Sequence, residues 1–161
     1  MNLRFLGYLT GLVVIALGAG VLVSGGVSAI YGDTDMTPLL VIGAAYLALG
    51  GVLYTVSRSA AKAYIGFREG FVAVVASWVA AAVFGAIPYA VLGIFGPVDS
   101  LFESMSGFTT TGASVLVDYD QPHGIMFWRS LTHWYGGMGI VVLVLAFLPA
   151  VGGGAIRLFA A

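Results

Sequence analysis

The sequence contains no cysteine, which excludes disulfide bonds and thiolate metal sites and leaves the redox compartment undetermined. Charge is also scarce: charged residues make up 8% of the chain, against about 25% in ordinary soluble domains. The net charge is −1, so the chain lacks the basic surface that binds nucleic acid. These shortages point away from a soluble domain and from a nucleic-acid partner.

The sequence also lacks the residue patterns of an enzyme. It contains no nucleophile–base pair, no histidine–carboxylate metal cluster and no cofactor motif. The Gly136-Gly137-Met138-Gly139 run is not a nucleotide-binding loop, because no strand precedes it and apolar segments flank it. We expect these glycines to allow close helix packing instead. The chain is therefore predicted to be no enzyme and to need no cofactor.

Hydrophobic residues are abundant, at 60% of the chain. An apolar run of about 20 residues is long enough to cross a bilayer as a helix. Four runs approach or exceed that length: 5–30, 39–56, 71–95 and 125–148. The first is too long for a signal-peptide core, so we expect a retained span. The sequence predicts four transmembrane helices.

A short polar segment, Phe102-Glu-Ser-Met-Ser-Gly-Phe-Thr-Thr-Thr-Gly-Ala-Ser-Val115, separates the last two apolar runs. Polar backbone at membrane depth is tolerated only inside protein or along a water-filled path. We predict a half-length helix of about nine residues, or roughly 13 Å. Asp99 or Ser100 is its expected N-cap, Glu103 completes a capping box with Ser100, and Gly107 ends the helix.

The predicted fold is therefore an all-α integral membrane protein. It has four transmembrane helices, one re-entrant pore helix and a filter loop over 109–114. The small residues of that loop suit backbone carbonyls that replace the hydration shell of a monovalent cation, and the helix end that precedes it is partly negative. A polar re-entrant or outer loop without an ion is the alternative.

Charge placement predicts the orientation. Five of the six cations occur at Arg4, Arg58, Lys62, Arg68 and Arg157, and most anions occur at Asp33, Asp35, Asp99, Asp118 and Asp120. Arg129, at the outer end of the last span, is the one cation that breaks this pattern. The positive-inside rule places both termini and the 57–70 loop in the cytoplasm. The acidic loops then face outward, where their carboxylates are either simply solvated or raise the local concentration of cations.

We predict two units, a transmembrane hairpin over 1–60 and a helix–pore loop–helix repeat over 61–161.

Ionisable residues in or near the fourth span are candidates for a functional role. Arg129 is expected to pair with an acidic residue, for which Glu103, Asp118 and Asp120 are available, and a direct role in conduction is the alternative. Glu103 is expected to brace the short helix rather than line a path. His133 is expected to form a hydrogen bond at a helix contact, and His123 to be solvated.

A second distinctive segment is Trp128-Arg-Ser-Leu-Thr-His-Trp-Tyr-Gly-Gly-Met-Gly-Ile-Val-Val-Leu-Val-Leu-Ala-Phe-Leu-Pro149. Together with 102–114, it resembles the TrkH/KtrB family of potassium-uptake transporters. The likeness runs from about residue 60 to the C-terminus, and the first two spans are similar to the helix pair that precedes the first repeat in the TrkH branch. Members of that family place four helix–pore helix–helix repeats around one pore.

The resemblance implies the site residues. The backbone carbonyls of Thr110, Thr111, Gly112 and Ala113 would bind K⁺, chiefly those of Thr111 and Gly112. Thr109, Ser114, Glu103 and Arg129 would support the loop.

The resemblance also implies the partners and the location. The sequence contains one repeat, so one quarter of a filter, and we expect either a first section of a longer transporter or a single-repeat protein. Its partners would be the remaining repeats or identical subunits, the lipid bilayer and a cytoplasmic nucleotide-binding regulator.

The predicted function is potassium translocation across the cytoplasmic membrane, with both termini in the cytoplasm. The alternative is a non-conducting membrane subunit or remnant that packs with other membrane chains through its glycine-rich faces.

Overall fold

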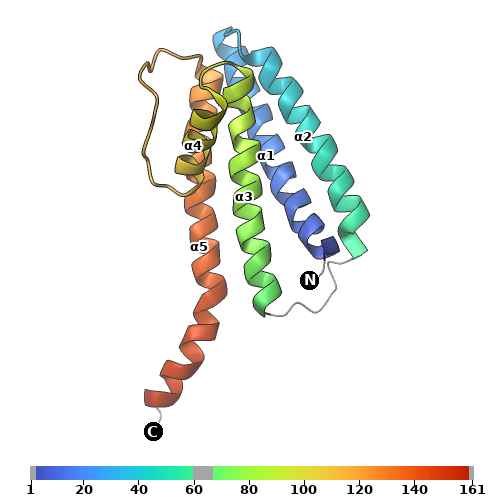
Figure 1. The fold of residues 1–161 in the computed structure, drawn as a ribbon, viewed down its shortest axis with the longest axis vertical. Helices are drawn as coiled ribbons and strands as arrows, with labels where there is room; N and C mark the ends of the chain where they lie inside the picture. Colours follow the sequence, from blue (N-terminus) through green and yellow to red (C-terminus); the bar gives the residue numbers. More distant parts are fainter. Residues whose placement is uncertain (1–2, 60–66, 160–161) are drawn as a thin grey trace.

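The computed structural model describes residues 3–59 and 67–159, with side chains as far as residue 141. Five helices follow one another: α1 (Leu3–Tyr31), α2 (Met36–Ser57), α3 (Phe67–Val91), α4 (Pro97–Phe108) and α5 (His123–Phe159). Every element in this part of the chain is helical, as the sequence predicts. The long helices lie roughly along one direction, and α4 is the short one among them (Figure 1).

Three of the helices are long and apolar enough to cross a membrane: Leu3–Tyr31, Met36–Ser57 and Arg68–Val91. The first two contain the predicted runs 5–30 and 39–56, and the third contains the predicted run 71–95 only as far as Val91. The fourth run, 125–148, lies within the 37 residues of α5. The side chains of α5 are described only as far as residue 141. The chain is thus an all-helical, multi-pass membrane protein.

Glycines bring α1 and α2 into close contact. A Cβ at Gly11 would lie 2.8 Å from the backbone nitrogen of Tyr54, and one at Gly50 would lie 2.8 Å from the backbone nitrogen of Ile15. Any larger residue at either position would push the two backbones apart. The hairpin therefore depends on small residues, as helix packing in membranes commonly does.

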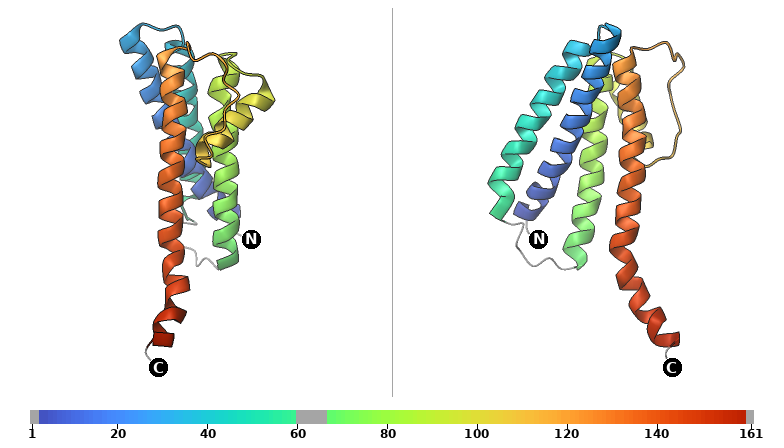
Figure 2. Two further views of the ribbon diagram at one scale, coloured as in Figure 1. Left: turned by 90° about the vertical axis from the view of Figure 1, so that its left-hand side faces the viewer. Right: turned by 180° about the vertical axis from the view of Figure 1, so that it is seen from behind.

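The α1–α2 hairpin also packs against the second half of the chain. The hydroxyl of Tyr135 on α5 donates a hydrogen bond to the carbonyl of Ala16 on α1 at 3.0 Å. Tyr46 on α2 donates to the carbonyl of Phe84 on α3 at 2.5 Å. The views in Figure 2 show α1 beside both α3 and α5 along part of its length. The boundary between residues 60 and 61 stays a prediction.

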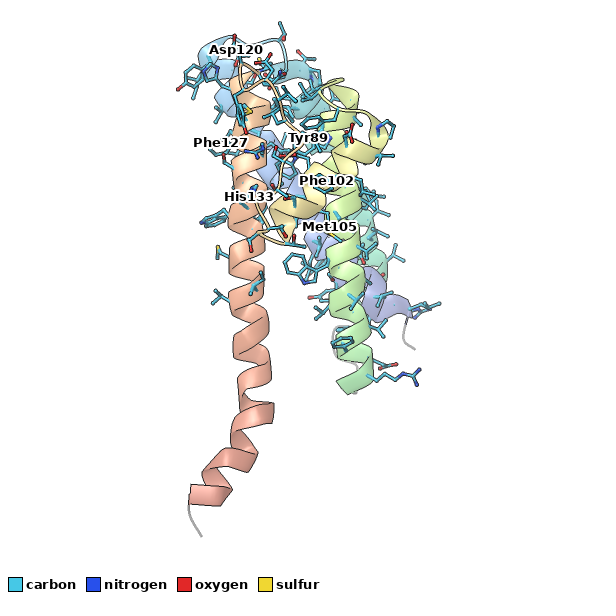
Figure 3. The ribbon with its side chains drawn as sticks, turned by 60° about the vertical axis from the view of Figure 1, so that its left-hand side comes forward. Tyr89, Phe102, Met105, Asp120, Phe127 and His133 are labelled. Carbon is cyan, nitrogen blue, oxygen red and sulfur yellow. The ribbon has the colours of Figure 1, made fainter. Side chains whose placement is uncertain are left out.

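The short helix α4 lies between α3 and α5 (Figure 3). It starts near the end of α3, and the non-helical segment 109–122 leads from its far end back to the start of α5. The two termini lie at one end of the molecule, and the turns after α1 and α3 lie at the other (Figure 1). This path positions residues 109–114 partway along the long helices.

Candidate functional site

The start of α4 differs from the sequence prediction. Its N-cap is Gly96, with Pro97 as the first helical residue and no side-chain cap. The expected capping box is wrong: the hydroxyl of Ser100 points to the carbonyl of Phe95 at 3.4 Å, and Glu103 bonds elsewhere. Proline explains the shift, because its ring is preset for the first turn of a helix and needs no N–H partner there.

Contacts from both neighbouring helices hold α4 in place. Ser104 donates to the carbonyl of Ala82 on α3 at 2.8 Å. On α5, a Cβ at Gly136 would collide with the carbonyl of Phe108, so the two backbones touch. The expectation that the glycine run of α5 serves close packing is thus confirmed at Gly136, whereas a Cβ at Gly137 would meet nothing closer than 4.0 Å. A Cβ at Gly107 would likewise collide with the Thr132 hydroxyl.

The C-terminal end of α4 turns through Thr110. The N–H groups of Thr109, Thr110 and Thr111 donate to the carbonyls of Met105, Gly107 and Ser106 at 2.9, 2.9 and 3.0 Å. Thr110 has φ +56°, the one positive φ at a non-glycine position in the described chain. The expectation that Gly107 ends the helix is wrong, because the left-handed turn falls three residues later. A β-branched residue in that region is strained.

The loop beyond the turn is exposed, and several of its carbonyls accept no hydrogen bond from the described part of the chain. Gly112 has φ +76°, and no atom lies within 4 Å of the place where a Cβ would sit. Residues 109–115 are all exposed. Within the described backbone, and the side chains described as far as residue 141, no hydrogen bond is directed to the carbonyl oxygens of Thr110, Thr111 or Gly112. The Ala113 carbonyl differs, since the hydroxyl of Ser106 donates to it at 2.5 Å.

Glu103 organises the return of this loop. Its carboxylate is 1% exposed and accepts a hydrogen bond from Arg129 Nε on α5 at 2.6 Å. The Ser114 hydroxyl lies 3.1 and 3.0 Å from its two oxygens, and the Val115 N–H donates at 3.1 Å. Of the three acidic partners predicted for Arg129, the structure selects Glu103. One buried carboxylate thus joins α4, α5 and the loop.

The remaining predicted residues have simpler surroundings. Thr109 donates to the carbonyl of Met105 at 2.8 Å, and its hydroxyl lies 2.8 Å from that of Thr111. His133 lies 3.0 Å from the carbonyl of Arg129 one turn earlier on its own helix. Asp118 accepts from the N–H of Asp120 at 2.9 Å, near the end where α5 starts (Figure 3).

Sequence reasoning missed the first turn of α5. Asp33 Oδ2 accepts the backbone N–H of His123 at 2.7 Å and lies 2.9 Å from its ring Nδ1. Asp35 Oδ2 accepts the N–H of Ile125 at 2.7 Å. The His123 side chain is 57% exposed, as predicted for a solvated residue, and its ring stacks on that of Tyr31 with the ring centroids 3.9 Å apart. These partners are 90 residues apart in sequence, and no local pattern reveals them.

The bonds to His123 also affect the ionisation of Asp33. The backbone N–H and then the ring of His123 hold the pKa of this carboxyl below its ordinary value of 3.8. Both groups favour the charged carboxylate by donating to it. Asp33 lies in the loop between α1 and α2, outside the spans.

No side-chain metal site is visible in the described part of the chain, where His, Asp and Glu nowhere gather in threes. Residues 39–160 match the family model described as "TrkH: Cation transport protein". The chain belongs to the TrkH family. Its resemblance to TrkH/KtrB transporters is thereby confirmed.

Relatives and a solved structure agree with this assignment. The chain is 38% identical over 168 residues to the Trk system potassium uptake protein TrkH of Escherichia coli K12, covering 100% of the chain and 34% of that protein. It is 40% identical over 113 residues to TrkH of Halomonas elongata, covering 68% and 23%. The crystal structure of the potassium transporter TrkH from Vibrio parahaemolyticus matches with a TM-score of 0.86 and 32% identity, covering 94% of the chain and 33% of that protein.

The chain thus matches between about a quarter and a third of the length of these relatives. The relatives are transporters of a potassium uptake system, and none of the names is that of an enzyme. Membership of a membrane cation transport family agrees with the three apolar helices of the described chain.

Proposed function

We propose that this chain takes part in potassium translocation across the cytoplasmic membrane and contributes one strand of a selectivity filter. The backbone carbonyls of Thr110, Thr111, Gly112 and Ala113 bind K⁺ in this proposal, chiefly those of Thr111 and Gly112. The supporting observation is the row of three carbonyls, from Thr110 to Gly112, that no group of the described chain uses. Carbonyl oxygens are the groups that replace the hydration shell of K⁺ in filters.

The shape of the segment supports the same proposal. The twelve residues of α4 span about 18 Å, a little over half of a hydrocarbon core of about 30 Å. Thr109–Ser114 then lie at membrane depth, with the partly negative end of α4 beside them. The chain crosses four times in this proposal, α4 is re-entrant, and both termini face the cytoplasm, with the loop after α1 outside.

Ala113 has a modified role in this arrangement. Its carbonyl oxygen already accepts the Ser106 hydroxyl, although a carbonyl has two lone pairs. Thr109, Ser114, Glu103 and Arg129 shape the loop rather than contact the ion. Of these, Glu103 contributes most, since it contacts both the loop and α5.

One strand supplies a quarter of a coordination ring. The other strands come from further repeats of a longer transporter or from identical copies arranged by rotational symmetry. The relatives are named as members of a Trk system, and a cytoplasmic nucleotide-binding regulator is the proposed further partner. The other repeats or subunits would cover the exposed apolar side chains of α4, which are Val98, Leu101, Phe102 and Met105.

A chimera tests the proposal. The 161-residue chain replaces the matching third of Escherichia coli TrkH, and K⁺ and Na⁺ uptake are measured in cells without other K⁺ uptake and in proteoliposomes. We expect K⁺ uptake with the native loop and a fall in the K⁺/Na⁺ ratio in Gly112→Ser. Gly51→Ser is the matched control, because it also lies in open space and is far from the loop in sequence.

Two results would contradict this assignment. A chimera that is present and folded in the membrane but carries no K⁺ would favour the alternative, a non-conducting chain that packs with other membrane chains. An unchanged K⁺/Na⁺ ratio in Gly112→Ser would remove the loop from the filter while leaving transport in place. Uptake by the 161-residue chain alone would identify identical subunits as its partners.

A further inference from the structure

Asp35 occupies an unusual place between two helices. It is the N-cap residue of α2, yet its side chain forms no capping bond to that helix. The carboxylate is instead 1% exposed and accepts the N–H of Ile125 in the first turn of α5 at 2.7 Å. The hydroxyl of Ser28 on α1 donates to its other oxygen. One carboxylate therefore links α1 and α2 to the start of α5.

The surrounding residues leave little freedom at this junction. A Cβ at Gly124 would lie 2.7 Å from Asp35 Oδ2 and 2.8 Å from the Cβ of Ser28. Asp33 adds a second carboxylate, which accepts the N–H of His123, two residues before Ile125. The first turn of a helix has unsatisfied N–H groups and a partly positive end, so two carboxylates there form charge-assisted bonds.

The junction connects to the loop through α5. Arg129 lies four residues, about one helical turn, after Ile125 and donates to Glu103. Glu103 in turn accepts the Ser114 hydroxyl and the Val115 N–H. A displacement of the first turn of α5 would move Arg129, and with it the carboxylate that holds the return of the loop.

We propose that Asp35, assisted by Asp33, is a positioning residue for the filter: it fixes the start of α5 from the N-terminal hairpin and so sets the position of the Glu103–Arg129 pair behind residues 109–114. The hairpin thereby acts as an outer brace for the pore loop. This inference rests on the proposed function for its effect on ions, whereas its mechanical part concerns hydrogen bonds alone.

Two measurements on the purified chimera test the two parts. Hydrogen exchange of peptides across 109–125 reports the Val115 amide, and the K⁺/Na⁺ uptake ratio reports the filter. In Asp35→Ala we expect the Val115 amide to exchange at least about tenfold faster, because a tenfold change in rate corresponds to losing part of the free energy of a charge-assisted hydrogen bond. We also expect a lower K⁺/Na⁺ uptake ratio. Asp35→Asn keeps an acceptor oxygen, so its Val115 exchange rate and its K⁺/Na⁺ uptake ratio should both stay close to the native values.

The control removes an outer carboxylate that has no link to α5. Asp120 is exposed, and its described bond runs from its own N–H to Asp118. Asp120→Ala should leave both the Val115 exchange and the uptake ratio at native values. If it lowers the ratio as much as Asp35→Ala does, surface charge explains the effect and the proposal is overturned.

The remaining outcomes are also decisive. Native exchange at Val115 in Asp35→Ala overturns the proposal. If Asp35→Ala speeds the exchange but keeps the native K⁺/Na⁺ uptake ratio, while Gly112→Ser lowers that ratio, the role of Asp35 in selectivity is overturned. If Gly112→Ser also leaves the uptake ratio unchanged, the proposed function itself has failed. If Asp35→Ala does not fold, Ser28→Ala removes the bond that holds Asp35, and native values for both measurements in that variant overturn the proposal.

Discussion

Glu103 Oε1 lies 2.6 Å from Arg129 Nε, and this ion pair between α4 and α5 is nearly enclosed by protein. Breaking a buried pair by removing one partner is costly because the other charge stays behind unpaired. The pair also touches the loop, since Glu103 accepts the Val115 N–H. Its loss should therefore affect stability and ion selectivity together.

The first prediction concerns that pair. Glu103→Gln should lower the free energy of unfolding by about 3 kcal/mol, since the 20% exposed Arg129 side chain would keep a charge without a partner. Unfolding in detergent, followed by tryptophan fluorescence, measures the change. Asp99→Asn is the control, because it removes an exposed carboxylate from the same helix and should cost under about 1 kcal/mol. Equal losses in both variants would show that the pair adds no stability.

The second prediction concerns strain at the loop. Thr110 is held at φ +56°, which costs an L-residue roughly 1–2 kcal/mol and glycine very little. Thr110→Gly should therefore be neutral or stabilising, whereas Thr111→Gly should destabilise by about 0.5–1 kcal/mol through the added freedom of the unfolded chain. Unfolding of the two variants in parallel checks the difference. A greater loss at Thr110 would mean that its hydroxyl bond to Thr109 outweighs the strain.

The third prediction concerns acid. The pKa of Asp33 is held below 3.8, first by the N–H of His123 and then by its ring. A lowered carboxyl pKa stabilises the fold above the unfolded value, and that stabilisation disappears as the pH falls through the folded value. The native chain should therefore lose stability below about pH 4. Asp33→Asn should show a weaker pH dependence there in thermal unfolding scans, and identical slopes would contradict the assignment.

Local sequence patterns predict some features of this chain and not others. Apolar runs predict the long helices, since their length and lack of charge suffice. The half-length helix and its small-residue turn are also visible in the sequence. The ends of α4 are not: Glu103 forms no capping box because Arg129, Ser114 and Val115 attract its carboxylate from other elements.

The bond between Asp35 and Ile125 shows the same limitation more strongly. Asp35 directly precedes a helix, and a local reading assigns its side chain to that helix or to solvent. Its actual partner is 90 residues away, and only the packing of α1 against α5 brings the two together. Tertiary contacts of buried polar groups therefore decided the parts of the site that sequence patterns could not predict.

The last prediction compares two adjacent glycines of α5. A Cβ at Gly136 would collide with the carbonyl of Phe108, whereas one at Gly137 would meet nothing closer than Thr110 Cγ2 at 4.0 Å. Gly136→Ala should destabilise by about 1–3 kcal/mol through overpacking, and it should displace α4 and lower the K⁺/Na⁺ uptake ratio of the chimera. Gly137→Ala should be neutral or stabilising by up to about 1 kcal/mol, because alanine favours the helix. Since backbone, not a flexible side chain, blocks the Gly136 position, no rotamer change can relieve the clash. Equal stability of the two variants would mean that α4 is free to move away from α5, and the close contact would then not determine the depth of the loop.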